Sequence, residues 1–284
     1  MSLSEANTRG GVAAGAARRS PIDWSGAILN GYLVLFFAYM FLPLLFMVVA
    51  AFNANPTPSV TDWQGFSFRW FAELPQDERF LQGLVHSLAI AIGVIVIAIP
   101  LGLAGALVLT RLQSRGTTVL YTVLVSPILT PGIVLGATTM IFWRDAFGVQ
   151  AGLLTATIAQ AGFIASYCML MFMARLQRQD RVLEEAALDL GASSVFVFRR
   201  ITLPFLMPTI LTASVISFLQ SIENYNTTFF AIGSSWTLVT EIGARMRFGL
   251  SPVVNVIGVI FVAITIVAAT AWVLSRRRAG PAAG

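Results

Sequence analysis

Long apolar runs alternate along the chain with shorter segments that hold nearly all of its charged residues. Each run reaches the roughly 20 residues that an α-helix needs to cross a hydrocarbon core about 30 Å thick. The pattern predicts an all-α fold, a polytopic membrane protein with six transmembrane helices in one domain over residues 26–276. The predicted spans are about 26–52, 82–109, 117–142, 151–174, 207–232 and 252–275.

Composition narrows the functions that such a chain can have. Of its 284 residues, 57% are hydrophobic and only 11% are charged, which leaves little room for a soluble catalytic domain. The single cysteine, Cys168, lies in an apolar run, so neither an internal disulfide nor a thiolate metal cluster can form. No nucleophile motif, carboxylate pair or glycine-rich loop followed by lysine stands out. We therefore expect a non-enzymatic chain with no catalytic, cofactor-binding or metal-binding residues of its own.

The basic residues follow the predicted topology. The sequence has no lysine, and 13 arginines fall on the side that holds both termini, against five on the other side. Arginine and lysine gather on the cytoplasmic side of membrane proteins. Both termini are therefore expected in the cytoplasm, as tails over residues 1–25 and 277–284. The arginines show no interleaving with aromatic residues, which argues against a nucleic-acid partner.

The loop between the fourth and fifth predicted spans, residues 175–206, is the longest connection on the cytoplasmic side. Val182–Leu190 reads as a short amphipathic helix, and Gly191 ends it because glycine accepts a tightly turned backbone. A second short helix from about Ser193 to Arg200 is expected to follow, stopped by Pro204. On physical grounds alone, an interfacial helix that packs under the bundle remains an alternative.

Helical spacing separates two faces of this first short helix. Apolar and small residues recur at intervals of three and four, while Glu184, Glu185 and Asp189 can lie together on a wetter face. This arrangement predicts a short helix that lies along the cytoplasmic surface.

One set of residues in this loop has a specific spacing. They are Glu185, Ala186, Ala187, Gly191, Ile201, Leu203 and Pro204. The set resembles the EAA signature of importer-type ABC permeases, in which this loop forms a coupling helix that docks in a groove of the nucleotide-binding subunit. The resemblance implies that Glu185 is the polar contact to the ATPase. It also implies that the two alanines allow close approach and that Gly191 makes the turn.

The resemblance extends over nearly all of the six-span region. The segments FNANP, SPILTPGIVLG, SIENYNTTFF and RMRFGLSPVVNVIG are similar to the second membrane subunit of spermidine/putrescine-type permeases. This implies a multi-pass protein of the bacterial inner membrane, in contact with membrane lipid. Its implied partners are a second permease subunit in a heterodimer, two ATPase subunits that bind ATP and Mg²⁺, and an external solute-binding protein.

Glu223 is the clearest acidic residue inside a predicted span, and such residues are costly unless they have a function. It would lie about 24 Å along the fifth span from its cytoplasmic start. Asn224, Tyr225 and Asn226 follow it, so the four residues could line a path for a cation. Polyamine-type relatives often carry two adjacent acids here, whereas Asn224 is neutral. The alternative is that Glu223 pairs with Arg245 or Arg247.

These observations favour a permease subunit that forms half of a translocation pathway for a small cationic solute such as a polyamine. Other solutes of related permeases remain open: opines, amino-acid-like amines, thiamine or iron complexes. A self-sufficient secondary carrier is the other alternative, but the sequence has no convincing internal repeat and one clear intramembrane acid.

Overall fold

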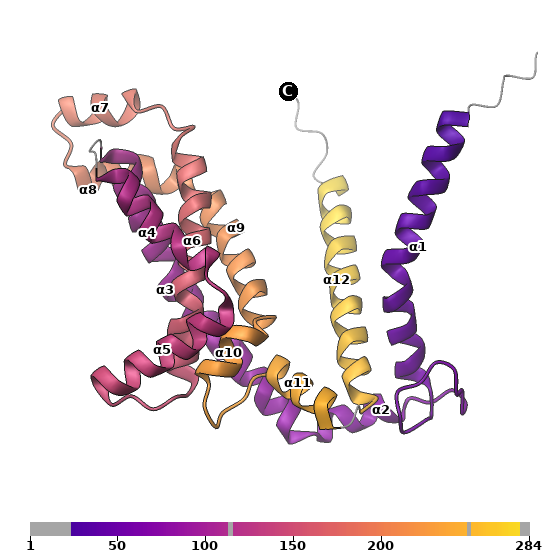
Figure 1. The fold of residues 1–284 in the computed structure, drawn as a ribbon. Coiled ribbons are helices and arrows are strands. Elements are labelled where there is room, and N and C mark those ends of the chain that lie inside the picture. The colour runs from indigo at the N-terminus through magenta and orange to yellow at the C-terminus, as the bar shows by residue number, and fades with distance from the viewer. Residues whose placement is uncertain (1–23, 113–115, 249–250, 279–284) are drawn as a thin grey trace, which may run out of the picture.

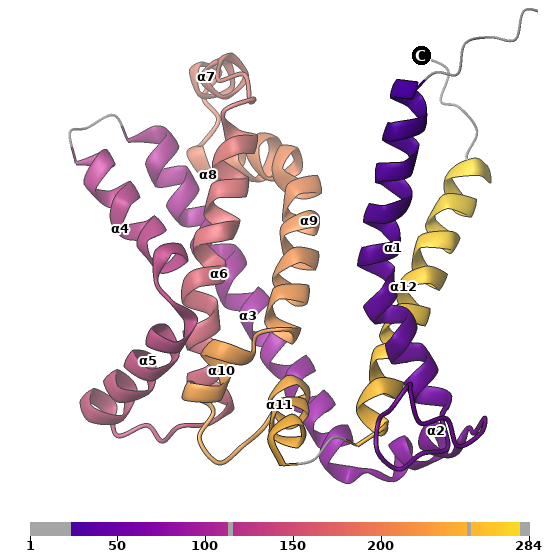
Figure 2. The same ribbon diagram turned by 45° about the vertical axis from the view of Figure 1, so that its right-hand side comes forward.

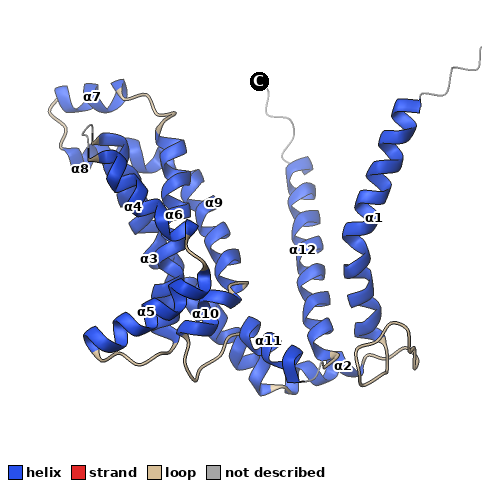
Figure 3. Ribbon diagram, viewed as in Figure 1, coloured by secondary structure: helices blue, strands red, loops and turns tan. Residues whose placement is uncertain are grey.

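The computed structural model describes residues 24–112, 116–248 and 251–278 (Figure 1). Within those ranges the regular elements are helices, and the sole β-pairing is an isolated bridge between Asn53 and Phe66 (Figure 3). The predicted all-α polytopic fold is confirmed. The predicted terminal tails lie outside the described residues, except for 24–25 and 277–278, which belong to helices.

Among the described residues, five helices are long and apolar enough to cross a membrane, and a sixth crossing is counted if one bent pair forms a single span. The long helices are α1 (Trp24–Phe52), α3 (Glu78–Arg111), α6 (Leu153–Leu176), α9 (Leu203–Ile222) and α12 (Val253–Arg278). The bent pair is α4 (Thr117–Leu129) with α5 (Gly132–Phe147). The short helices are α2 (Arg69–Glu73), α7 (Val182–Asp189), α8 (Ser194–Val197), α10 (Tyr225–Ala231) and α11 (Leu238–Phe248), with a 3₁₀ turn at Leu74–Gln76.

The long helices form two groups (Figures 1 and 2). Helices α3, α4, α6 and α9 make a bundle that carries α7 and α8 at one end, whereas α5, α10 and α11 lie toward the other end. We call these the α7 end and the α11 end. Helices α1 and α12 pair beside the bundle, and their outer ends, near Trp24 and Arg278, lie toward the α7 end (Figure 1). Both described ends of the chain therefore lie on one side.

Helix α1 buries little of its length. Apart from its last turns it exposes large apolar side chains such as Tyr39 and Phe41, 79% and 60% exposed. Near its end Met47 packs on Gly258 of α12, where a side chain on the glycine would collide with the methionine. Most of this apolar surface has no cover from the described part of the chain, which suits contact with lipid or another subunit.

The bundle core forms where α3 and α6 approach closely. A Cβ atom on Gly102 would lie 2.7 Å from Cβ of Cys168, so only glycine permits this spacing. Ala98, Ala106 and Phe172 are fully buried around the contact. Membrane helices have little hydrophobic drive to associate, so this close van der Waals packing is what holds them. Cys168 is 2% exposed, so it is a small buried residue of this core.

The third predicted span, 117–142, does not form one straight helix. It divides between α4 and α5, which meet at an angle of 106°. The break falls at Thr130 and Pro131, because a proline disfavours helical geometry in the residue before it and Thr130 is extended (ψ 130°). Helix α5 then packs on α10, where Gly136 lies against the backbone of Thr227.

The second short helix of the 175–206 loop does not stop at Pro204. Helix α8 continues through a π-helical turn, Phe198–Thr202, into α9, so the helix is continuous from Ser194 to Ile222. In this wider turn the N–H of Leu203 donates to the carbonyl of Phe198, and Pro204 follows directly, where a missing N–H disrupts the helix least. The prediction of a stop was wrong because it ignored this geometry.

An ion cluster fixes α11 to the start of α3 at the α11 end. Glu241 is 5% exposed and accepts hydrogen bonds from Nε of Arg79 (3.1 Å) and Nε of Arg245 (2.9 Å). Nη1 of Arg245 also lies 2.7 Å from Oδ2 of Asp77, and its guanidinium stacks over the ring of Phe80. Burial raises the pKa of Asp77, but its hydrogen bonds from Arg245 and Phe80, and the Arg245 charge, bring the net pKa below 3.8.

We expect Arg245→Gln to lower the free energy of unfolding by about 1–3 kcal/mol, because buried Glu241 loses one of its two charged partners. In the wild type, the stabilisation from Asp77 is present above its ordinary pKa and is lost as the pH falls through the lower folded-state pKa. In the variant, Arg245 no longer lowers the pKa of Asp77, so this acid-induced loss should become smaller. Thermal unfolding in detergent across acidic pH measures both effects. Arg247→Gln, outside the cluster, is the control, and an equal loss there would contradict this account.

Candidate functional site

Helix α7 matches the short amphipathic helix that the loop sequence predicts. It spans Val182–Asp189 and ends at Gly191, whose φ is +87°. The N–H of Ala192 donates to the carbonyl of Ala187 (3.0 Å) and the N–H of Gly191 to that of Leu188 (2.9 Å). This paired pattern is the common glycine-terminated helix end, and it needs a left-handed residue at position 191.

The outer surface of α7 is uncovered. No residue of the helix is buried, and the apolar side chains of Val182, Leu183 and the C-cap Leu190 are 63%, 60% and 89% exposed. Among the described residues, the exposed carboxylate of Glu185 has no hydrogen-bond or ion-pair partner. A short helix with an exposed apolar rim and a free carboxylate is suited to contact another protein.

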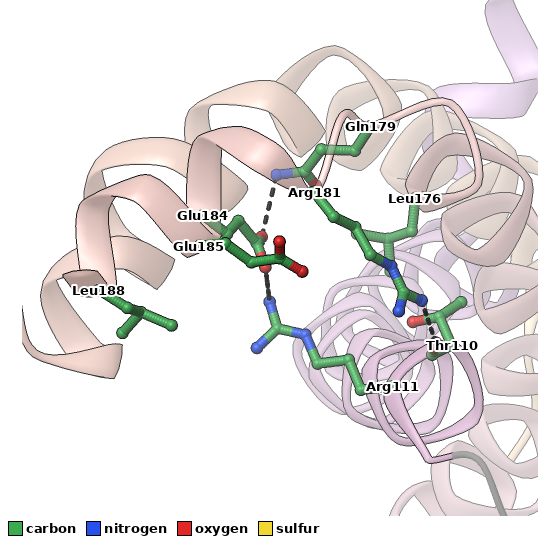
Figure 4. A pocket seen from close by; sticks show the side chains of 8 residues that line it. All are labelled: Thr110, Arg111, Leu176, Gln179, Arg181, Glu184, Glu185 and Leu188. Carbon is green, nitrogen blue, oxygen red and sulfur yellow. Dashed lines mark hydrogen bonds and ion pairs between the residues drawn. The ribbon is translucent and has the colours of Figure 1, made fainter.

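Glu184 behaves differently from its neighbour. Its side chain is 17% exposed, and its two oxygens lie 3.0 and 3.1 Å from Nη2 of Arg111, the last residue of α3. Gln179 and Thr202 also donate to it. The contacts border a hollow of about 180 Å³ between α7 and the ends of α3 and α6 (Figure 4). Sequence reasoning missed this role, because the partner lies 73 positions away.

The other residues of the EAA-like set lie apart from α7. Ile201 belongs to the π-helical turn, and Leu203 and Pro204 form the first turn of α9. Arg175, at the end of α6, donates to the carbonyl of Phe205 and stacks over its ring at 4.1 Å. The set is thus divided between a surface helix and the joint through which that helix connects to α9.

The Glu223 segment forms a break between two helices instead of the middle of a span. Helix α9 ends at Ile222, Glu223 is its C-cap, and α10 starts at Tyr225 with Asn224 as N-cap. The Asn224 side chain accepts a hydrogen bond from the N–H of Thr227 (3.1 Å). The predicted single span 207–232 is therefore wrong at this point. A break of this kind exposes backbone and polar side chains at membrane depth, which is tolerated where they line a cavity.

A hollow of about 300 Å³ opens at this break. All four predicted pathway residues line it, and three further residues complete the wall. The lining residues are Phe163, Tyr167, Gln220, Glu223, Asn224, Tyr225 and Asn226. Aromatic rings and a carboxylate are the groups that attract an organic cation. Gln220 adds a buried side-chain oxygen with no hydrogen-bond partner among the described residues. The missed residues lie on α6 and on the preceding turn of α9.

A buried polar network holds this break in place. Gln160 of α6 is 1% exposed, and its amide donates to Oγ1 of Thr228 (2.6 Å) and accepts from Oγ of Ser221 (2.6 Å). One side chain thus connects the end of α9 to α10 across the break. The network fixes Glu223 and Asn224 because buried hydrogen bonds are costly to leave unmade.

We expect Gln160→Leu to lower the free energy of unfolding by about 1–3 kcal/mol, because the buried Ser221 hydroxyl loses its acceptor and the Thr228 hydroxyl keeps only its bond to the carbonyl of Asn224. Thermal unfolding of the purified protein in detergent measures the loss. Gln150→Leu, on an exposed residue, is the matched control. A loss no greater than in the control would contradict the role of Gln160.

The alternative pairing of Glu223 with an arginine is not formed in this conformation. Arg245 is bound to Asp77 and Glu241, and Arg247 stacks over the ring of Phe229 at 5.4 Å. Within the described ranges, Glu223 has no ion-pair partner, and its side chain is exposed toward the hollow.

Comparison with known proteins identifies the family to which the chain is similar. The profile of the family described as "Binding-protein-dependent transport system inner membrane component" matches residues 98–279. The putrescine transport system permease protein PotI of Escherichia coli (strain K12) is 32% identical, over 86% of this chain and 89% of that protein. The spermidine/putrescine transport system permease protein PotC of the same strain is 28% identical, over 84% and 89%.

Solved structures share the fold. A chain of a bacterial ABC transporter involved in import of the acidic polysaccharide alginate has a TM-score of 0.68 at 17% identity, covering 90% of this chain and 96% of that one. A chain of the MetNI methionine ABC transporter in an inward-facing conformation has a TM-score of 0.57 at 20% identity, covering 72% and 97%. At such low identity the likeness establishes the fold alone.

Proposed function

The chain belongs to the family of binding-protein-dependent transport inner membrane components, the permeases of ABC importers, and we propose that its solute is a small polyamine-like cation. Members of this family are non-enzymatic membrane subunits that work with a separate ATPase and a binding protein. No cofactor is part of the permease itself. ATP and Mg²⁺ would be bound by the partner ATPase.

The observation that carries the coupling role is the uncovered surface of α7. Its free Glu185 carboxylate and exposed Val182, Leu183 and Leu190 would dock in a groove of the ATPase. Ala186 and Ala187 would allow close approach, and Gly191 would set the turn. Ile201, Leu203 and Pro204 would link the docked helix to α9. A rigid helix held in this way transmits ATP-driven closure as a rigid-body displacement.

The assembly would place the α7 end and both termini in the cytoplasm of a bacterial cell, with the α11 end outside its inner membrane. The described arginines support this orientation, since Arg111, Arg175 and Arg181 lie toward the α7 end. A second permease subunit, in a heterodimer, would cover part of the exposed apolar face of α1. Two ATPase copies would then meet the two coupling helices, and an external binding protein would deliver solute at the α11 end.

The solute class is supported by the hollow at the helix break. Glu223 presents a carboxylate without a cationic partner among the described residues, and Tyr167 and Tyr225 stand beside it. These groups attract an ammonium. Asn224 and Asn226 would supply neutral oxygens. The names of the relatives, putrescine and spermidine/putrescine permeases, point to the same class.

The test is to purify the complex that assembles on this chain and to reconstitute it in proteoliposomes with its binding protein. We expect putrescine or spermidine to stimulate ATP hydrolysis and to be accumulated. A panel of an opine, an amino acid, thiamine and an iron complex is the comparison, and stimulation by one of these would replace the polyamine assignment. Uptake by the chain alone, without an ATPase, would indicate a secondary carrier and overturn the proposal.

A further inference from the structure

Helix α7 cannot be held in place by an apolar core. It has eight residues, none of them buried, and an isolated helix of this length is marginal in water. If α7 is to transmit a displacement, something other than packing must connect it firmly to the membrane helices. Polar contacts with neighbouring elements make that connection.

Most of these contacts meet at Glu184. Its carboxylate binds Arg111 at the end of α3, Gln179 in the loop after α6, and Thr202 in the π-helical turn before α9. We call these four residues the Glu184 clasp. Arg181, just before α7, adds a hydrogen bond to the carbonyl of Thr110 (Figure 4).

The helices joined by the clasp extend to the ion cluster at the α11 end and to the break at Glu223. Helix α3 runs from Arg111 to the ion cluster at Asp77, and α9 runs from Thr202 to the break at Glu223. Thr202 is fully buried, so its attachment to Glu184 reaches the interior. Glu185, the next residue, is exposed and unpaired. Both side chains line the hollow of Figure 4, but Glu184 is bound within the chain, whereas the Glu185 carboxylate is free to bind a partner.

We propose that the Glu184 clasp, and chiefly its ion pair with Arg111, is the joint through which a displacement of α7 reaches α3 and α9. Glu184 is a positioning residue: it touches neither solute nor nucleotide. Without the clasp the ATPase still docks and hydrolyses ATP, but α9 no longer follows α7. This inference rests on the proposed function, in which an ATPase moves α7.

The chain offers a reporter that does not depend on the solute. Val215 is 60% exposed and Leu219 is 59% exposed, and both share a face of α9 with Glu223 because the spacing is four residues. Cys168, the single cysteine of the sequence, is 2% exposed, so it gives little background. The labelling rate of Val215→Cys by a membrane-impermeant cationic methanethiosulfonate therefore reports movement of α9.

The experiment uses the purified complex in lipid nanodiscs, with and without ATP and vanadate. With an intact clasp we expect ATP to change the labelling rate by about tenfold, the size of a typical coupling between sites. Glu184→Gln and Glu184→Arg should reduce this change to less than about twofold while the ATPase stays bound and active. The double variant Arg111→Glu/Glu184→Arg should restore most of the change. Asp145→Arg, which breaks the exposed ion pair with Arg144 away from α7, is the matched control.

The outcomes separate the two proposals. If no ATPase co-purifies, or if the intact clasp gives no ATP-dependent change, the proposed function fails. If ATP changes the labelling rate equally with the intact clasp and in both Glu184 variants, the clasp does not transmit the movement. The proposed function is then unaffected. A double variant that assembles but does not recover overturns the pairing with Arg111. Because Glu184→Gln keeps the side-chain shape, it decides the question even if the charge reversals assemble poorly.

Discussion

Replacing Gly191 with valine is expected to reduce ATP-driven uptake by at least about tenfold and to weaken binding of the ATPase, because the left-handed conformation costs an L-residue about 1–2 kcal/mol. The φ of +87° at this position closes the end of α7. A β-branched residue tolerates it least. The variant should still insert in the membrane, since no residue of α7 is buried in the bundle core. Co-purification of the ATPase and uptake by proteoliposomes measure the two effects.

A matched control exists at the opposite end of the molecule. Gly148 ends α5 with a φ of +65°, and a Cβ atom would meet nothing within 4 Å at either glycine. Gly148→Val therefore introduces similar backbone strain away from α7, and the ATPase should remain bound. Gly191→Asn should retain most activity, because asparagine tolerates the left-handed region. Normal ATPase binding and uptake in Gly191→Val would contradict the coupling role.

The features that sequence predicted well are those set by neighbouring residues. Four of the six long apolar runs became unbroken long helices, because a helix satisfies its own backbone hydrogen bonds and needs no distant partner in lipid. The turn at Gly191 follows from a local rule for helix ends, and α7 from spacing over eight residues. These local patterns do not depend on how distant parts of the chain pack.

The break at Glu223 and the sharpness of the turn between α4 and α5 were not predicted, because distant partners stabilise them. The polar break at Glu223 reads as part of an apolar run in sequence, yet it is held by Gln160, which lies 61 positions from Ser221. The sharp turn between α4 and α5 is likewise completed by packing of Gly136 against Thr227. Hydropathy records only the total apolarity of a segment, so it cannot distinguish a broken span from a straight one.

The different roles of Glu184 and Glu185 also could not be predicted from the sequence. Spacing assigns both to the wetter face of one helix, and the family resemblance draws attention to Glu185 alone. Only the position of Arg111, 73 residues earlier, turns Glu184 toward the bundle. Two adjacent acids on a short helix are a signal of opposite roles only once the neighbouring elements are known.

Glu223→Lys is expected to reduce uptake of putrescine by at least about a hundredfold, because two like charges a few Å apart repel by several kcal/mol in a partly dry site. The ATPase should remain bound, since α7 lies at the other end of α9. Uptake and ATP hydrolysis by proteoliposomes measure the effect. Glu78→Lys, an exposed acid near the start of α3, is the control for a change of net charge. Normal uptake and specificity in Glu223→Lys would remove Glu223 from the pathway.

The neighbouring position separates a specific cation site from general repulsion. The Asn224 side chain caps α10, and aspartate caps a helix equally well, so Asn224→Asp should keep the break intact. It places a second carboxylate beside Glu223. If the hollow binds a dication, the KM for putrescine should fall by about tenfold, while that for a monoamine changes little. An unchanged KM in Asn224→Asp, together with lost uptake in Glu223→Lys, would mean that Glu223 admits cations without binding them.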